Sequence, residues 1–203
     1  MPRRRPGIAR AGGVVAAAAV ARSAATARTD DAPGTAGSAA GSPRYQLRQR
    51  LVSIGDDFRI TDQHGNLAYL VDGKALRVRS TLRFLDPDGT ERYRIQEKVL
   101  RVRDSMRVQR PDGTVAARVH NALLTPLRDR WTIEVPGGDA LQATGNILDH
   151  EYRIRRGGTT VATVSRRWFR VRDTYGVEIG ATEDAALLLT VVVVIDMMAH
   201  PGR

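Results

Sequence analysis

The chain has 203 residues, with 32 Lys and Arg against 22 Asp and Glu, which gives a formal net charge of +10. This length accommodates a single domain with a substantial core, together with a tail. The sequence contains no cysteine, which excludes disulfides, thiolate nucleophiles and cysteine metal sites. A positive chain favours phosphate-bearing or anionic-lipid partners. Residues 45–203 nevertheless hold 25 basic and 20 acidic residues, below the usual excess of a nucleic-acid binder.

Residues 1–43 are predicted to be a disordered tail. They consist mainly of Arg, Ala, Gly, Ser and Pro and contain no aromatic residue. Such a composition buries too little apolar surface to offset the entropy lost on ordering. One alternative is a signal peptide in residues 1–27, with an apolar run at 14–20 and Ala25-Thr26-Ala27 as its cleavage site, although Arg22 interrupts this layout. Another alternative is a start codon assigned too early.

Deletion of residues 1–43 is expected to leave the melting temperature nearly unchanged, because this composition offers almost nothing to pack against a folded domain. Thermal unfolding of the truncated and full-length chains measures this directly. A loss of more than about 1 kcal/mol in the free energy of unfolding would show instead that the tail docks on the domain.

From residue 44 the pattern changes to short alternating runs separated by turn residues, which is typical of antiparallel strands. Glycines fall in the expected turns at positions 65, 89, 113, 137 and 158, and the first four are 24 residues apart. A tight hairpin turn needs a residue at positive φ, which glycine adopts without steric cost. The expected strands include the runs 58–60, 67–71, 82–85, 93–95, 106–108, 115–119, 131–135 and 152–154.

A second repeat lies between these hairpins. The segments 76–82, 100–106 and 169–175 are near copies of one another, each with an Arg-Val-Arg core. Because alternate side chains of a strand share a face, we expect their apolar side chains to point inward and their paired arginines outward. A repeated strand unit favours a barrel or sheet made from duplicated hairpins.

The segment 185–195 is the most apolar stretch of the chain. A transmembrane helix needs about 20 apolar residues, and eleven residues without alternation or a turn are long for a strand, so both of these alternatives are disfavoured. A buried helix over about 183–198 is favoured. A helix that is apolar all round has to be surrounded by protein, and the side chains of 187–195 are therefore expected to be almost fully buried.

Both ends of this helix carry sequence signals. Thr182 is the expected N-cap, and Glu183 and Asp184 then lie in the first turn, where negative charge suits the helix dipole. Pro201-Gly202 follows the last apolar residues and is the expected terminator.

Several segments in a fixed order carry a family resemblance. They are Tyr45-Gln46-Leu47-Arg48-Gln49-Arg50, Ile54-Gly55-Asp56-Asp57-Phe58, the spaced Asp-Gly turns, Arg172-Asp173-Thr174-Tyr175-Gly176-Val177-Glu178-Ile179 and the closing run 184–198. This layout resembles the LURP-one-related family, whose fold is similar to the C-terminal domain of Tubby proteins and to phospholipid scramblases. The resemblance implies a mainly β domain over residues 44–203, a barrel of about twelve antiparallel strands around a buried C-terminal hydrophobic helix. It implies little about activity, and lipid binding carries over only by analogy of fold.

No catalytic or metal site is predicted, and no cofactor is expected. His64, His120, His150 and His200 are scattered without metal-ligand spacing, so solvated or structural roles are expected for them. Asp86-Pro87-Asp88-Gly89 has the residues of a tight turn and lacks the later glutamate of a calcium loop. The sequence has no Gly-rich phosphate loop and no serine elbow motif. We therefore expect that the protein is not an enzyme.

The positive hypothesis concerns the arginines of the repeated strand unit. They are Arg77, Arg79, Arg101, Arg103, Arg170 and Arg172. Neighbouring guanidinium groups bind phosphate bidentately. The alternative is a solvated strand face neutralised by nearby acidic residues. Trp131 and Trp168 are expected to pack in the barrel rather than to anchor it in a membrane interface.

The leading functional hypothesis is a non-catalytic, monomeric binding module for anionic lipid headgroups, cytoplasmic or peripheral at a membrane surface. The first alternative is a structural or protein-interaction β-domain without a lipid partner. A nucleic-acid binder is less favoured, because aromatic and basic residues do not interleave in a stacking pattern. A working signal peptide in residues 1–27 would make the protein secreted.

Overall fold

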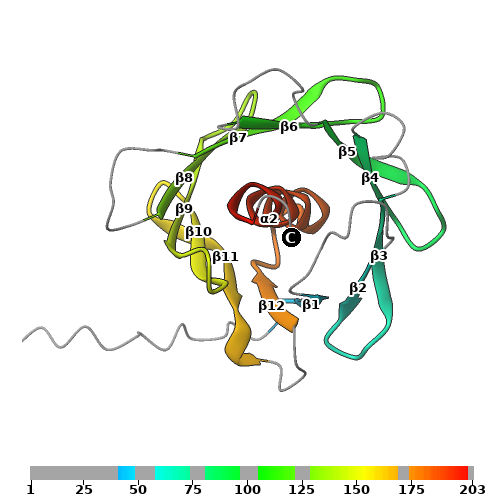
Figure 1. The fold of residues 1–203 in the computed structure, drawn as a ribbon, viewed down its shortest axis with the longest axis horizontal. Coiled ribbons are helices and arrows are strands. Elements are labelled where there is room, and N and C mark those ends of the chain that lie inside the picture. The colour runs from blue at the N-terminus through cyan, green and yellow to red at the C-terminus, as the bar shows by residue number, and fades with distance from the viewer. Residues whose placement is uncertain are drawn as a thin grey trace, which may run out of the picture. The chain divides into compact units, whose positions relative to one another are not determined.

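The computed structural model describes residues 41–48, 58–73, 81–96, 105–121, 129–168 and 174–200. Within these residues, twelve antiparallel strands close into a barrel around one helix, as the family resemblance implies (Figure 1). The strands are β1 (Arg44–Arg48), β2 (Phe58–Asp62), β3 (Leu67–Asp72), β4 (Thr81–Leu85), β5 (Glu91–Gln96), β6 (Ser105–Gln109), β7 (Val115–Asn121), β8 (Asp129–Glu134), β9 (Leu141–Asn146), β10 (Glu151–Arg156), β11 (Thr159–Ser165) and β12 (Thr174–Ile179). The helix is α2 (Ala185–Ala199), and a short 3-10 helix, η1 (Arg166–Trp168), follows β11.

Strands that are consecutive in the chain are neighbours in the sheet, and β1 closes the barrel against β12. The closing register runs from Arg44 opposite Glu178 to Arg48 opposite Thr174. The backbone N–H of Ile179 also donates to the carbonyl oxygen of Pro43 at 3.1 Å. A truncated chain for the tail experiment therefore best begins at residue 41, so that this bond is retained.

The hairpin turns adopt the predicted conformation. The turn glycines have φ angles of 85° (Gly65), 88° (Gly89), 85° (Gly113), 78° (Gly137) and 92° (Gly158). In the first three of these turns the glycine N–H donates to the carbonyl three residues earlier, at 2.9 to 3.0 Å, and the strand register shifts beside the turn. A type I turn followed by a glycine in the left-handed region produces this combination. The same hairpin geometry therefore recurs at Gly65, Gly89 and Gly113.

The alternation of strand direction gives the barrel two different ends. The turns after β2, β4, β6, β8 and β10 lie at one end, which we call the tight-turn rim. The connections after β1, β3, β5, β7, β9 and β11 lie at the opposite end, which we call the long-connection rim. The segments 74–80, 97–104 and 169–173 belong to connections whose flanking strand ends lie at the long-connection rim.

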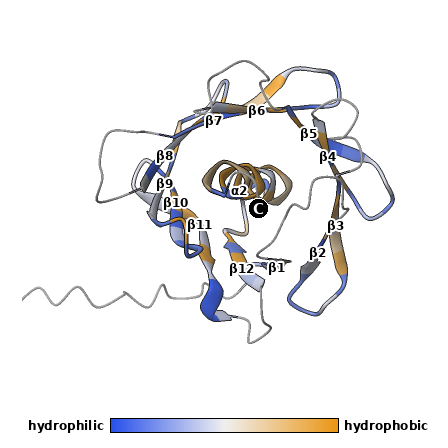
Figure 2. Cartoon of the chain, in the orientation of Figure 1, coloured by the Kyte–Doolittle hydropathy of each residue, from blue (hydrophilic) through white to orange (hydrophobic). Residues whose placement is uncertain are grey.

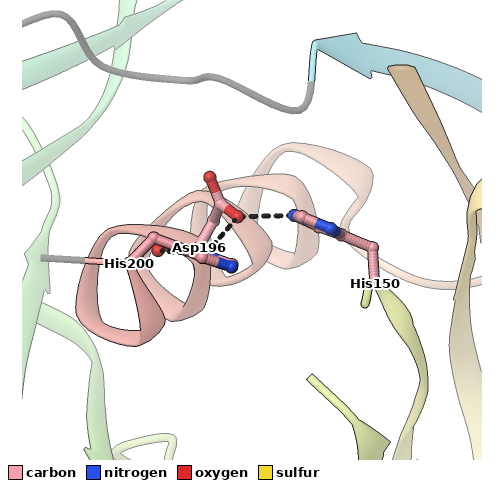
Figure 3. Close-up of side chains that lie close together, drawn as sticks. All are labelled: His150, Asp196 and His200. Carbon is pink, nitrogen blue, oxygen red and sulfur yellow. Dashed lines mark hydrogen bonds and ion pairs between the residues drawn. The ribbon is translucent and has the colours of Figure 1, made fainter. Parts of the chain in front are cut away.

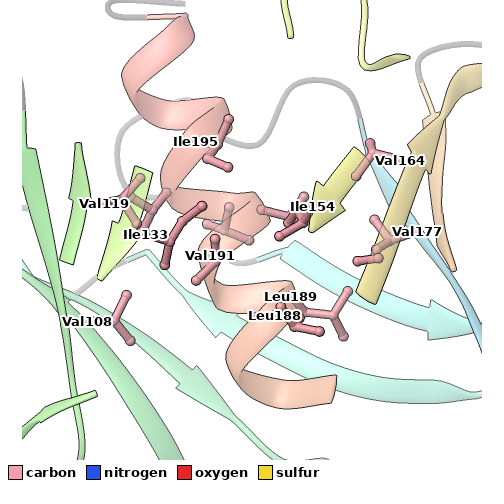
Figure 4. Packing of buried hydrophobic residues seen from close by; sticks show 14 of the residues in the cluster. Val108, Val119, Ile133, Ile154, Val164, Val177, Leu188, Leu189, Val191 and Ile195 are labelled. Atoms are coloured by element: carbon pink, nitrogen blue, oxygen red, sulfur yellow. The ribbon is translucent and has the colours of Figure 1, made fainter. Parts of the chain in front are cut away.

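Helix α2 lies in the middle of the ring of strands and provides its core (Figures 1 and 4). Leu189, Val191 and Ile195 are 0% exposed, and wall residues such as Ile133 and Val177 are equally buried. Figure 2 shows hydrophobic colouring along much of α2 and hydrophilic colouring in the turns that join β2 to β3 and β4 to β5. The apolar run is thus surrounded by protein, as a helix without a polar face requires.

The valine-rich sequence of α2 has a high intrinsic preference for strands. A strand would nevertheless be unstable inside the barrel. A closed barrel has no free edge, so a strand inside it would leave its backbone N–H and C=O groups unpaired and buried. A helix satisfies these groups within itself. The hydroxyl of Thr190 follows the same rule by donating to the carbonyl oxygen of Ala186 at 2.7 Å.

Two details of the predicted helix are wrong. The N-cap is Asp184 rather than Thr182, because the Asp184 carboxylate accepts from the Leu187 N–H at 2.9 Å and also from the Tyr93 hydroxyl at 2.7 Å. The helix therefore begins at Ala185. Leu187 is only partly buried, whereas the side chains from Leu188 to Ile195 are buried as expected.

Salt bridges and hydrogen bonds fix the start of α2 at the tight-turn rim. Arg156 on β10 makes a bidentate contact with Glu183, at 2.7 and 2.8 Å.

The described part of the chain contains no helix with the length and apolar character needed to span a membrane. The inward and outward orientation predicted for the Arg-Val-Arg copies falls largely outside the described residues.

Candidate functional site

Three ionisable side chains meet at the far end of α2. Asp196 lies in the last turn of α2, His200 is the C-cap residue four positions later, and His150 is the last residue of the connection between β9 and β10 (Figure 3). The Nε2 atom of His150 lies 2.6 Å from Oδ1 of Asp196, and Nδ1 of His200 lies 3.2 Å from the same oxygen. We call this group the His-Asp-His cluster. It lies at the long-connection rim, because α2 runs there from the tight-turn rim.

The cluster is almost sealed from solvent. The side chains of His150, Asp196 and His200 are 2%, 6% and 11% exposed. An isolated carboxylate at such a depth would cost several kcal/mol, and the two imidazole rings offset that cost by direct contact. The cluster also joins the helix to the barrel wall, since one imidazole comes from each.

The surroundings of His200 are rich in acceptor atoms. Its Nε2 atom lies 3.3 Å from the carbonyl oxygen of Leu148, and its Nδ1 atom lies 3.2 Å from the carbonyl oxygen of Asp196 as well as from the Asp196 carboxylate. Oxygen atoms therefore face both ring nitrogens of this imidazole. The Nε2 contact with Leu148 fixes which nitrogen is available to the carboxylate.

The ring of His150 is held by stacking. It lies against Tyr175 with ring centroids 4.2 Å apart and against His200 at 5.3 Å. Its Nδ1 atom and the Tyr175 hydroxyl have no hydrogen-bond partner among the described residues. Burial raises the pKa of Tyr175 and of Tyr152 well above the usual range, and the nearby Asp196 carboxylate raises the pKa of both further. Both phenols therefore stay neutral beside the cluster.

The backbone of His150 has an unusual conformation. Its φ angle is 56°, in the left-handed region that non-glycine residues rarely adopt, and its N–H closes a turn by donating to the carbonyl oxygen of Ile147 at 3.0 Å. Such strain persists only where surrounding contacts determine it. Here the contacts of the imidazole ring with Asp196, Tyr175 and His200 hold the residue in place.

The structure places the four histidines in different environments. His64 lies in the exposed β2–β3 turn, as expected, and His120 on β7 lies 3.5 Å from Glu134. His150 and His200, by contrast, are not scattered but share the Asp196 carboxylate. The sequence separates them by 50 residues, so no spacing could reveal the pair. A partial signal was available in the four-residue spacing of Asp196 and His200 at the end of a helix.

The six arginines proposed from the sequence lie outside the described residues; they are Arg77, Arg79, Arg101, Arg103, Arg170 and Arg172.

The two tryptophans predicted to pack in the barrel are both among the described residues. Trp131 is 2% exposed and packs in the core, as predicted. Trp168 is partly buried, with the guanidinium carbon of Arg44 5.1 Å from its ring centroid.

Several described charges on the sides of the barrel form ion pairs. Glu91 accepts from Arg83 at 2.6 Å and from Arg94 at 2.8 Å, and Glu178 accepts from Arg44 at 2.6 Å. The alternative of a solvated, neutralised strand face concerns the six proposed arginines themselves and stays a prediction. The strands that carry these pairs are outside the segments of the six proposed arginines.

A closed twelve-stranded antiparallel barrel around a C-terminal hydrophobic helix is the Tubby-like architecture. A family model described as LURP-one-related matches residues 44–196, and the chain belongs to this family. The X-ray structure of a protein from Arabidopsis thaliana has a similar fold, with a TM-score of 0.60 and 18% sequence identity, over 78% of this chain and 93% of that chain. Comparison with curated proteins gave no match.

Proposed function

We propose that the barrel is a non-catalytic module that binds anionic, phosphate-bearing lipid headgroups through its long-connection rim. The observation that carries this proposal is an opposition of charge between the two rims. The connections whose flanking strand ends lie at the long-connection rim contain twelve basic and six acidic residues; they are 49–57, 73–80, 97–104, 122–128, 147–150 and 166–173. Eight of these basic residues and three of the acidic ones belong to the segments 74–80, 97–104 and 169–173. Each of these segments holds one pair of the candidate arginines.

The tight-turn rim has the opposite character. Its described connections contain one arginine, Arg110, and the acidic residues Asp86, Asp88, Asp112, Asp139, Glu183 and Asp184. Acidic groups at one end and basic groups at the other orient a molecule in the field of a negatively charged surface. This polarity supports approach to an anionic surface with the long-connection rim forward.

Arginine suits this role for chemical reasons. The guanidinium group presents its N–H donors in a planar fork that matches two phosphate oxygens, and it remains charged at any physiological pH. Each basic residue near an anionic membrane contributes about 1 kcal/mol. Six arginines at one rim would therefore support measurable binding although the domain as a whole is only mildly basic.

The proposal is tested by co-sedimentation of the chain from residue 41 with lipid vesicles, since the tail carries arginines of its own. We expect binding to vesicles that contain phosphatidylserine or phosphoinositides, and no binding to pure phosphatidylcholine. Reversal of Arg101→Glu with Arg103→Glu should weaken binding at least about 30-fold, the equivalent of two lost arginines. Raising the salt concentration should weaken it as well, since the Debye length is about 8 Å at 0.15 M.

The matched control lies on the barrel side. Arg153 and Arg155 form a second Arg-x-Arg pair on β10 and make no ion pair within the described residues. Reversal of both to Glu changes the net charge equally, yet should leave most of the vesicle binding intact. Equal losses in the two double variants would indicate a non-specific charge effect. Equal binding to neutral and anionic vesicles would favour the structural or protein-interaction module instead.

A further inference from the structure

We propose that His150, Asp196 and His200 form a binding site for a divalent transition-metal ion of the zinc class. One ligand atom of each residue lies within 4.8 Å of the others. Two imidazole nitrogens and a carboxylate oxygen are the ligands that Zn²⁺ and Co²⁺ prefer, whereas Ca²⁺ and Mg²⁺ prefer oxygen alone. The donor set therefore selects the class of metal.

The distances are close to those of a metal centre. Bonds of about 2.0 Å in a tetrahedral site place neighbouring ligand atoms about 3.3 Å apart. The separation of 3.2 Å between Nδ1 of His200 and Oδ1 of Asp196 already meets this value. The separation of 2.6 Å between Nε2 of His150 and Oδ1 is that of a hydrogen bond. Binding thus requires the His150 ring to retreat from this oxygen by about 0.7 Å.

The second layer of contacts fits at His200, whereas Nδ1 of His150 has no hydrogen-bond partner among the described residues. A histidine that binds a metal ion through one nitrogen usually donates the other N–H to a carbonyl or carboxylate. His200 has this arrangement, because its Nε2 atom faces the Leu148 carbonyl oxygen at 3.3 Å. Its Nδ1 atom faces the carboxylate and carbonyl oxygens of Asp196, both at 3.2 Å.

The ligands come from two parts of the fold, and this gives the ion a defined role. His150 belongs to the β9–β10 connection of the barrel, whereas Asp196 belongs to α2 and His200 is the C-cap residue of that helix. A bound ion would fasten the last turn of α2 to the β9–β10 connection at the long-connection rim. Because the unfolded chain does not hold these residues together, the free energy of metal binding would add to the free energy of unfolding.

The experiment uses the full chain, purified without a polyhistidine tag and treated with EDTA. Addition of CoCl₂ should give the visible d–d absorption of four-coordinate Co²⁺, with one ion per chain. At a Zn²⁺ concentration of 100 times the dissociation constant, the melting temperature should rise by about 5 °C or more. His200→Ala should abolish both responses. His64→Ala is the matched control, since His64 lies in an exposed turn, and should retain both.

Histidine ¹⁵N spectra of the wild-type chain provide a readout that needs no variant to fold. Zn²⁺ should shift the ring nitrogens of two histidines and leave those of the exposed His64 unchanged. The proposal is overturned if Zn²⁺ changes neither the histidine spectra nor the melting temperature. It is overturned equally if the responses disappear in His64→Ala and persist in His200→Ala.

Discussion

Replacement of Leu188 by aspartate should unfold the barrel. Leu188 lies on α2, is 2% exposed, and is surrounded by the inner faces of the strands (Figure 4). Loss of a buried leucine costs about 2 to 5 kcal/mol, and burial of an unpaired carboxylate costs several kcal/mol more. Domains of this kind have total stabilities of about 5 to 15 kcal/mol, so the sum removes most or all of the folded state. Circular dichroism and thermal melting of the purified variant measure the effect.

The control for this substitution is the same chemical change at an exposed site. Leu148 is 57% exposed at the long-connection rim, and Leu148→Asp should change the free energy of unfolding by about 0.5 kcal/mol or less. A soluble Leu188→Asp protein with a cooperative transition near that of Leu148→Asp would contradict the role of α2 as the core of the barrel.

Replacement of Gly145 by alanine should cost about 3 kcal/mol or more. Gly145 has a φ of 139°, and a Cβ atom there would lie 2.6 Å from the Glu151 carbonyl oxygen and 2.7 Å from the Tyr152 Cα atom. Both of these are backbone atoms of the neighbouring strand β10, in which Tyr152 lies opposite Gly145 and Glu151 lies opposite Asn146. The clash therefore has to separate the strands or distort the backbone, and backbone strain alone costs about 1 to 3 kcal/mol. Urea unfolding measures the loss.

Gly138→Ala supplies the comparison for Gly145→Ala. A Cβ atom at Gly138 would meet the Val135 side chain at 3.7 Å, an ordinary contact distance. Its stability should stay within about 1 kcal/mol of the wild type. If the two alanine variants unfold at the same urea concentration, the close approach of β9 and β10 at Gly145 is not a determinant of stability.

The hairpins were predictable because their determinants are local. A glycine such as Gly89 reports on the φ of its own turn, and the strands on either side alternate in the sequence as they do in the barrel. The start of α2 was less predictable for a physical reason. Thr182 and Asp184 are both good N-caps, and Asp184 is stabilised by a hydrogen bond from Tyr93, 91 residues away.

Only part of the candidate metal site could be predicted from the sequence. Asp196 and His200 are linked by helix periodicity, which a sequence displays. His150 joins them only because the β9–β10 connection and the end of α2 meet at the same rim. That meeting depends on closure of the entire barrel, and closure is a property of all twelve strands together rather than of any segment.

The position of α2 at the end of the barrel chain has a consequence for biosynthesis. A ribosome releases the twelve strands before the residues that fill their interior, and β1 must wait for β12, as the Arg44–Glu178 pair spans 134 residues. Until α2 emerges, the inward faces of the strands have no partner, and exposed apolar strands of this kind attract chaperones or aggregate. Premature termination before residue 185 would therefore yield a hollow, unstable polypeptide even though every strand had been translated.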